Sequence, residues 1–144
     1  MKFYFASSIK GSSSFNKAAN DESIISHLMK LGQVLAGHLD NGKYKINYES
    51  KFTDREIHNK DIEWLLTSDA LIAEVSNPSL GVGYEIGRAV ENNIPVLCLF
   101  YKVNKKLSSM IRGCDKVIIK EYYDINEAKN FINEFIKQIN KNKK

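Results

Sequence analysis

Cysteine is scarce in this chain, and the placing of its two copies excludes two kinds of protein. Cys98 and Cys114 form no CxxC motif and have no histidine at a metal-ligand spacing. The sequence therefore predicts neither a disulfide framework nor a metal site, and we expect no cofactor. Such cysteine usage is typical of the reducing cytoplasm, which is the expected location.

Long apolar runs and a strong net charge are also missing. No run approaches the roughly 20 residues that a membrane-spanning helix needs, and residues 1–5 lead into a strand pattern and not into a signal peptide. The net charge of +4 is modest. The lysines near the end of the chain are not interleaved with aromatic residues, unlike those of single-strand binding surfaces. We therefore expect neither a membrane nor a nucleic acid as a partner.

The chain does have the composition of a soluble globular protein, with 43% hydrophobic and 26% charged residues among 144. This length predicts one domain, residues 1–144. Strands are expected at 2–7, 33–35, 70–75, 94–100 and 116–119, helices at 22–31, 54–67, 107–112, 125–140 and around Glu85, and irregular structure at 40–48. The alternation predicts an α/β fold with a doubly wound, five-stranded parallel sheet of the Rossmann or flavodoxin-like type. Ligands of such sheets bind beyond the carboxyl ends of the strands.

The most informative segment is N-P-S-L-G-V-G-Y-E-I-G-R at residues 77–88, directly after the expected strand at 70–75. Gly81 and Gly83 predict a tight turn whose amide groups can meet an anion at the start of a helix. Glu85, one turn inside that helix, is expected to stay ionised, which suits a nucleophile. The alternative is an ordinary strand-to-helix turn in which Glu85 only complements the helix dipole. The glycine spacing is not that of the dinucleotide-binding fingerprint.

Asp61 is the second unusual residue, because it lies within the apolar arc of the helix expected at 54–67. A carboxylate facing inward must be paired, hydrogen-bonded or protonated. Asp61 is therefore either a proton donor or orienting group at the crevice, or a satisfied buried acid. Ser8 and Lys10, after the first strand, could hold a phosphate or could simply be solvated. By strand alternation, Tyr4 is expected in the core, on the face opposite its two neighbouring phenylalanines.

Four blocks of sequence carry a resemblance to a known family. They are F-Y-F-A-S-S-I-K-G at 3–11, D-I-E-W-L at 61–65, A-E-V-S-N-P-S-L-G-V-G-Y-E-I-G-R-A at 73–89 and L-S-S-M-I-R-G at 107–113. In order and over nearly the whole chain, they resemble the 2'-deoxynucleoside 5'-phosphate N-hydrolases of the nucleoside 2-deoxyribosyltransferase-like superfamily. The last block favours the hydrolases over the transferases.

The resemblance implies a role for each matching residue. Glu85 would be the nucleophile at the sugar C1', with Asp61 and Tyr4 as its catalytic partners. The implied substrate-binding residues are Ser8, Ile9, Lys10, His38, Ser79, Gly81, Ser108, Ser109 and Met110. Ser108 and Met110 would enter the site of the neighbouring subunit, so the active unit would be a homodimer.

The resemblance has two departures. Ser7 stands where a glycine is expected, and Lys10 replaces an arginine, which removes the bidentate fork that arginine offers to phosphate.

The expected reaction is hydrolysis of the N-glycosidic bond of 2'-deoxynucleoside 5'-monophosphates, through a glycosyl intermediate on Glu85, giving free base and 2-deoxyribose 5-phosphate. The alternatives are a deoxyribosyltransferase, a ribonucleotide hydrolase acting on substrates such as cytidine monophosphate, and a non-catalytic nucleotide-binding module. The phosphate loop with Lys10 argues against the transferase. The joint presence of Glu85, Asp61 and Tyr4 argues against the binding module. Base preference and tolerance of a 2'-hydroxyl cannot be predicted from the sequence.

Overall fold

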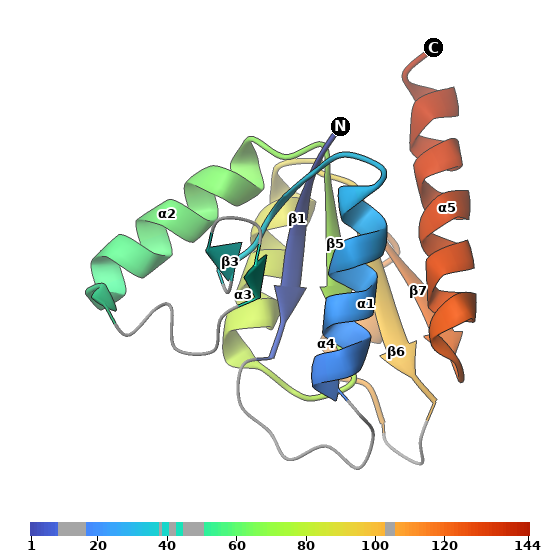
Figure 1. Ribbon diagram of the computed structural model, residues 1–144, viewed down its shortest axis with the longest axis horizontal. Helices are drawn as coiled ribbons and strands as arrows, with labels where there is room; N and C mark the ends of the chain where they lie inside the picture. Colours follow the sequence, from blue (N-terminus) through green and yellow to red (C-terminus); the bar gives the residue numbers. More distant parts are fainter. Residues whose placement is uncertain (9–16, 38, 41–42, 45–50, 103–105) are drawn as a thin grey trace.

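The computed structural model describes residues 1–8, 17–37, 39–40, 43–44, 51–102 and 106–144. Its elements follow one another as strands separated by helices (Figure 1). In chain order they are β1 (Lys2–Ser7), α1 (Lys17–Met29), β2 (Gln33–Leu35), β3 (Leu39–Asp40), β4 (Lys43–Tyr44), α2 (Asp54–Leu66), β5 (Ala70–Glu74), α3 (Leu80–Glu91), β6 (Val96–Tyr101), α4 (Ser109–Arg112), β7 (Val117–Tyr122) and α5 (Ile125–Asn142).

The main sheet has five strands in the order β2-β1-β5-β6-β7, and every pairing in it is parallel. From β1 the chain moves outward to β2, and it then returns to the other side of β1 to place β5. The winding therefore reverses between β1 and β5, where Ser7 pairs with Glu74 in register. This confirms the predicted doubly wound sheet and puts the switch point at the carboxyl ends of these two strands.

Helices cover both faces of the sheet, α1 and α5 on one side and α2 and α3 on the other (Figure 1). The side chains of β1 alternate between these faces as predicted. Phe3 and Phe5 pack into the core under α1 and α5, whereas Tyr4 joins Leu65 and Ile86 in the core under α2 and α3. Burying each large side chain contributes about 1.5–3 kcal/mol to folding. The face that Tyr4 enters is the one that carries the candidate site.

Helix α2 begins where the sequence predicts. Thr53 Oγ1 accepts a hydrogen bond from Glu56 N at 3.2 Å, and Glu56 Oε1 accepts one from Thr53 N at 3.3 Å. This reciprocal capping box satisfies two amide groups that the helix leaves unpaired at its start. The cap fixes the register of α2 and so the side of the helix on which Asp61 lies.

The predicted elements differ from the structure most at three places. Helix α1 begins at Lys17 and not at residue 22. The K-A-A-N segment at its start lacks the apolar periodicity that predicts a helix, but its alanines favour helical structure. Strand β7 runs to Tyr122 and not to residue 119, because an edge strand tolerates the polar Lys120 and Glu121 that interrupt its apolar pattern. Part of the stretch expected to be irregular forms the antiparallel pair β3–β4.

Two ends of the chain meet at the amino edge of the sheet. Asp69, directly before β5, accepts a hydrogen bond from Lys2 N at 2.7 Å and one from Lys143 Nζ at 2.8 Å. Both contacts stabilise the charged carboxylate, and the Lys143 bond is the largest of several causes that lower the pKa of Asp69.

Among the helices within the described ranges, none is long and apolar enough to cross a bilayer.

Candidate active site

Helix α3 starts one turn earlier than the glycines suggest. Its N-cap is Ser79, whose Oγ accepts a hydrogen bond from Val82 N at 3.3 Å. Gly81 and Gly83 therefore lie inside the first turn of the helix, and neither has a positive φ. The prediction of a glycine turn before the helix is wrong, because the serine cap and not glycine flexibility begins α3. The helix N-terminus still faces the carboxyl edge of the sheet, where its partial positive charge favours an anion.

A cavity of about 170 Å³ opens at the switch point between β1 and β5. It brings together Tyr4, Asp61, Ser79, Gly81 and Glu85, five of the predicted site residues, from one strand, two helices and a helix cap. A Cβ at Gly81 would meet only Ser79 Oγ, at 3.9 Å, so there is open space beside this residue. The cavity thus places two carboxylates and a phenol beside a helix N-terminus.

Tyr4 and Glu85 are in direct contact. The Tyr4 hydroxyl donates a hydrogen bond of 3.1 Å to Glu85 Oε1, across 81 positions of sequence. Tyr4 is only 1% exposed, so its ring is held by the core and its hydroxyl has a fixed direction. A phenol donating to a carboxylate oxygen favours the charged form of that carboxylate and fixes its plane. The bond therefore fixes the orientation of the Glu85 carboxylate at the cavity.

Asp61 points into the protein, as its place in the apolar arc predicts. It is 8% exposed, and its Oδ1 lies 3.8 Å from Lys60 Nζ. The Lys60 ammonium itself lies 5.0 Å from the ring centroids of both Phe52 and Trp64, so two cation–π contacts help to hold it. A buried carboxylate needs such a partner. Asp61 therefore lines the cavity with the Lys60 ammonium close to its carboxyl group.

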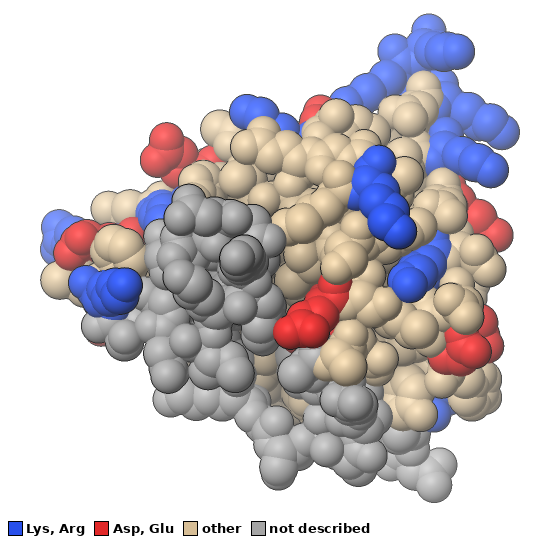
Figure 2. All heavy atoms as spheres, viewed as in Figure 1, with Lys and Arg blue, Asp and Glu red and all other residues tan. Residues whose placement is uncertain are grey.

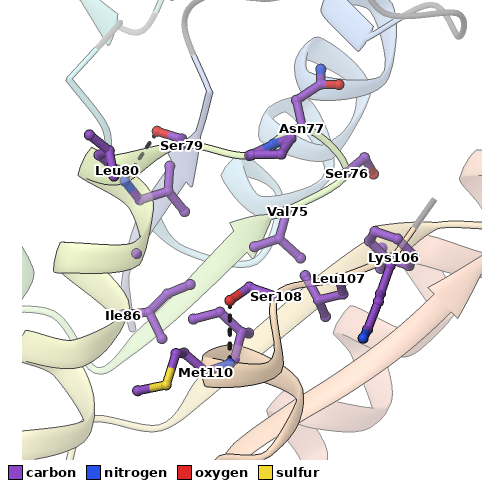
Figure 3. Close-up of a pocket in the computed structure, with 15 residues that line it drawn as sticks. Val75, Ser76, Asn77, Ser79, Leu80, Ile86, Lys106, Leu107, Ser108 and Met110 are labelled. Carbon is purple, nitrogen blue, oxygen red and sulfur yellow. Dashed lines mark hydrogen bonds between the residues drawn. The ribbon is translucent and has the colours of Figure 1, made fainter.

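A second, larger cavity of about 570 Å³ also has Ser79 in its lining (Figure 3). Its walls are mainly apolar and come from the turn after β5, from α3, from β6 and from α4. Ser108 caps α4 by accepting a hydrogen bond from Met110 N at 3.3 Å, and both residues face this cavity. Ser79 lines both cavities, whereas Glu85 lines the smaller one. Within one chain, Ser108 and Met110 are thus separated from Glu85 by the start of α3.

The remaining predicted residues fall into two groups. Ser8 is buried directly after β1, and Ser109 is exposed in the first turn of α4. The predicted roles of Ile9, Lys10 and His38 fall on residues outside the described part of the chain. Within the described ranges, no group of three histidine, cysteine or acidic side chains is arranged to hold a metal ion.

His58 is closer to the site than its exposed helical position indicates. Its Nε2 lies 2.8 Å from the Tyr84 hydroxyl, which also accepts a hydrogen bond of 2.6 Å from Arg88 Nη1. His58 and Tyr84 line a third cavity, of about 300 Å³, together with Asp61 and Glu85. The two carboxylates therefore border two cavities. The sequence could not predict this pairing, since His58 and Tyr84 lie on different helices and 26 positions apart.

The chain is similar in sequence to known proteins. The family model for nucleoside 2-deoxyribosyltransferases matches residues 3–110. A 5-hydroxymethyl-dUMP N-hydrolase of Danio rerio is 38% identical over 145 residues, which cover 99% of this chain and 100% of the relative. The Homo sapiens protein of the same name is 44% identical over 112 residues, which cover 76% of this chain and 63% of the relative.

The fold is shared with solved structures of low sequence identity. A Clostridium botulinum CMP N-glycosidase has a TM-score of 0.69 at 18% identity, covering 94% of this chain and 99% of its own. A 2-deoxyribosyltransferase of Bacillus psychrosaccharolyticus has a TM-score of 0.62 at 16% identity, covering 90% and 91%. Sequence motifs, family match and fold agree. A putative 2'-deoxynucleoside 5'-phosphate N-hydrolase of Nematostella vectensis is 43% identical over 126 residues, which cover 84% of each chain. The chain belongs to the nucleoside 2-deoxyribosyltransferase family, and within it to the branch of the 2'-deoxynucleoside 5'-phosphate N-hydrolases.

Proposed function

We propose that this protein hydrolyses the N-glycosidic bond of 2'-deoxynucleoside 5'-monophosphates, releasing the base and 2-deoxyribose 5-phosphate. The observation that carries the proposal is the Tyr4–Glu85 hydrogen bond in the cavity that Asp61 also lines. An oriented, anionic carboxylate is what an oxocarbenium-like transition state needs at C1'. The names of the relatives support the same reaction class, because all three describe N-hydrolases of a deoxynucleoside monophosphate.

The reaction has two steps in which Glu85 changes its bonding. In the first, a Glu85 oxygen forms a bond to C1' while the bond from C1' to the base nitrogen breaks, and the base keeps that electron pair. Asp61 donates a proton to the departing base or orients it. In the second step, water attacks C1' and gives its proton to the Asp61 carboxylate, which lost its own proton in the first step, and the Glu85 carboxylate leaves. Tyr4 holds one carboxylate oxygen throughout, so that the carboxylate keeps its direction toward the sugar.

The 5'-phosphate is assigned to the start of α3. Ser79 and Gly81 stand at this helix N-terminus and line the cavity that contains Glu85. Partial positive charge and amide groups favour an anion at such a position. Ser8, Ile9 and Lys10 after β1 and His38 complete the substrate contacts in this proposal, on the strength of the family resemblance.

We also propose that the active unit is a homodimer. Leu80 and Met110 are 96% and 84% exposed, and both line the large apolar cavity beside Ser79. Exposed apolar side chains around a hollow of this size are typical of a protein contact surface. In the dimer, Ser108 and Met110 of each subunit reach the other subunit's site, as the resemblance implies. Two equivalent sites follow from two-fold symmetry.

The cysteines support a reducing location. Cys98 and Cys114 are both free, and burial raises the pKa of the Cys98 thiol to about 12, which makes it unreactive. We therefore propose that the enzyme works in the cytoplasm.

A substrate panel tests the function directly. The protein is incubated with deoxynucleoside monophosphates, including 5-hydroxymethyl-dUMP, with the matching ribonucleotides, and with deoxynucleosides that lack phosphate. Free base is measured with and without an added acceptor base. We expect base release from deoxynucleoside monophosphates alone, lost in Glu85→Ala and kept in Glu91→Ala, which changes an exposed acid on the same helix. Equal kcat/KM for a deoxynucleoside and its monophosphate, or a new nucleoside formed with the acceptor, would contradict the proposal.

A further inference from the structure

A second group of acidic side chains lies on the opposite face of the sheet from Tyr4, Asp61 and Glu85. Asp21 of α1 is 0% exposed and Glu74 of β5 is 1% exposed. They belong to the side covered by α1 and α5, at the same carboxyl edge as the site. The mechanism above gives neither residue a role. A carboxylate so fully buried costs several kcal/mol unless its contacts compensate, so its contacts indicate its purpose.

Asp21 is bound to the end of β1. Ser7 Oγ donates a hydrogen bond of 2.8 Å to Asp21 Oδ2, and both side chains are buried. Ser7 is the last residue of β1, lines the cavity that contains Glu85, and precedes Ser8. The bond therefore connects the end of β1, directly before the proposed phosphate loop, with the second turn of α1.

Glu74 is bound to the turn after β5. Glu74 Oε1 accepts hydrogen bonds from the Ser76 hydroxyl and from Ser76 N, the latter at 3.2 Å. Ser76 Oγ in turn accepts one of 2.8 Å from Tyr101 N in β6. The Tyr122 hydroxyl of β7 donates to the same Glu74 oxygen at 3.4 Å. Three residues beyond Ser76 stands Ser79, the cap of α3.

The two carboxyl groups belong to one electrostatic cluster. Burial raises the pKa of Tyr122, and the charges of Glu74 and Asp21 raise it further, so the hydroxyl stays protonated and can donate. Tyr122 is thus the group on which the charges of both carboxylates act. The cluster thus includes residues of β1, α1, β5 and β7. It contacts the two chain segments that border the proposed site, the end of β1 and the turn after β5.

We propose that Asp21 and Glu74 are positioning residues for the nucleotide site, Asp21 by fixing Ser7 at the end of β1 and Glu74 by fixing Ser76 in the turn that leads to Ser79. The inference rests on the proposed function, because the nucleotide is the ligand whose binding is measured. Neither carboxylate touches substrate. Each acts through a serine hydroxyl and the backbone on which that serine lies.

Three buried serines provide a matched test. Ser7 and Ser76 donate to buried carboxylates at the carboxyl edge, whereas Ser68 Oγ donates a 2.7 Å bond to Trp64 O at the amino edge. Each is changed to alanine, and KM, kcat and Tm are measured with a deoxynucleoside monophosphate. We expect KM to rise about tenfold in Ser7→Ala and Ser76→Ala, the effect of losing one hydrogen bond to a charged group. In Ser68→Ala, KM should be unchanged while Tm falls to a similar extent.

Conservative changes at the carboxylates separate positioning from bulk stability. Asp21→Asn and Glu74→Gln keep an oxygen that can accept from the serine and should retain most of the affinity, whereas Asp21→Ala should raise KM as much as Ser7→Ala. The double variant Ser7→Ala/Asp21→Ala should show no further rise. A KM in Ser7→Ala and Ser76→Ala equal to that of Ser68→Ala at matched Tm would overturn the inference.

The two proposals fail in different ways. An inactive wild-type protein refutes the hydrolase function, and the same variants are then compared by the Kd of the monophosphate measured by calorimetry. Equal Kd values, or no binding by any of the proteins, would overturn the positioning role too. An active wild type whose KM does not respond at Ser7 or Ser76 refutes the positioning role alone.

Discussion

The bond from Tyr4 to Glu85 is the contact on which the proposed chemistry depends, and the sequence predicts only the two residues that it joins. Strand alternation places Tyr4 on the α2/α3 face of the sheet, and the motif at residues 77–88 marks Glu85. That the hydroxyl reaches the carboxylate at 3.1 Å depends on how α3 packs against β1. Helix and strand periodicity relate residues only a few positions apart, so they cannot predict a contact across 81 positions. The family resemblance names both residues as partners but does not give their contact.

At this scale the first prediction concerns Tyr4→Phe. The ring remains and fills the same core position, so Tm should change little, whereas the oriented hydrogen bond to Glu85 is lost. A bond between a hydroxyl and a charged group contributes about 1.5–3 kcal/mol, and kcat should therefore fall about 10- to 100-fold. Single-turnover base release measures it. A variant with wild-type kcat would show that Glu85 does not need Tyr4.

The elements of the fold were predictable from apolar periodicity and capping, and their ends were less so. The capping box at Thr53 and Glu56 is a local signal, and α2 begins there as predicted. Helix α3 follows its strand as predicted, but Gly81 and Gly83 lie inside its first turn and do not form a turn before it, because Ser79 is the cap. The position of Asp61 followed from helical periodicity. The third cavity between α2 and α3 did not, since it depends on the packing of two helices.

The second prediction compares the caps of two helices. Ser79→Ala and Thr53→Ala each remove a side chain that accepts a hydrogen bond from the first turn, and each should cost about 1 kcal/mol of unfolding free energy. Because Ser79 also lines the nucleotide cavity, only Ser79→Ala should weaken binding of a deoxynucleoside monophosphate. Denaturant unfolding and calorimetric titration separate the two effects. Equal Kd values in the two variants would remove Ser79 from the proposed phosphate site.

For the whole molecule, the third prediction is subunit complementation. Glu85→Ala and a variant with Ser108 and Met110 both changed to alanine should each be inactive if every site needs Glu85 from one chain and the two other residues from its neighbour. Mixing and refolding them together should restore activity, because one site in each heterodimer regains all three residues. A monomer with full activity, measured by sedimentation, would contradict the dimer and leave the role of Glu85 intact.

The fourth prediction, also for the whole molecule, concerns pH and the junction at Asp69. The folded pKa of Asp69 is lowered, so its contribution to stability is present above the unfolded pKa of about 3.9 and is lost as pH falls through the folded value. Because the Asp69 side chain is 35% exposed and solvent screens its charge, that contribution is only a few tenths of a kcal/mol. Asp69→Asn should lower Tm at pH 7 and have no such effect near pH 2. A Tm deficit that persists near pH 2 would contradict this assignment.

The contacts of Lys2 and Lys143 with Asp69 also determine where a tag or a solid support can be attached to the protein without covering the cavity. Lys2 and Lys143 meet Asp69 at the amino edge of the sheet, and both chain ends lie at one end of the molecule, where Figure 2 also shows a group of basic side chains. The cavity with Glu85 opens at the carboxyl edge. An affinity tag, a fused reporter or a resin coupled through the terminal lysines would therefore hold the enzyme with the proposed substrate cavity turned toward the bulk solution. Immobilised in that way, a biocatalyst keeps its entrance unobstructed.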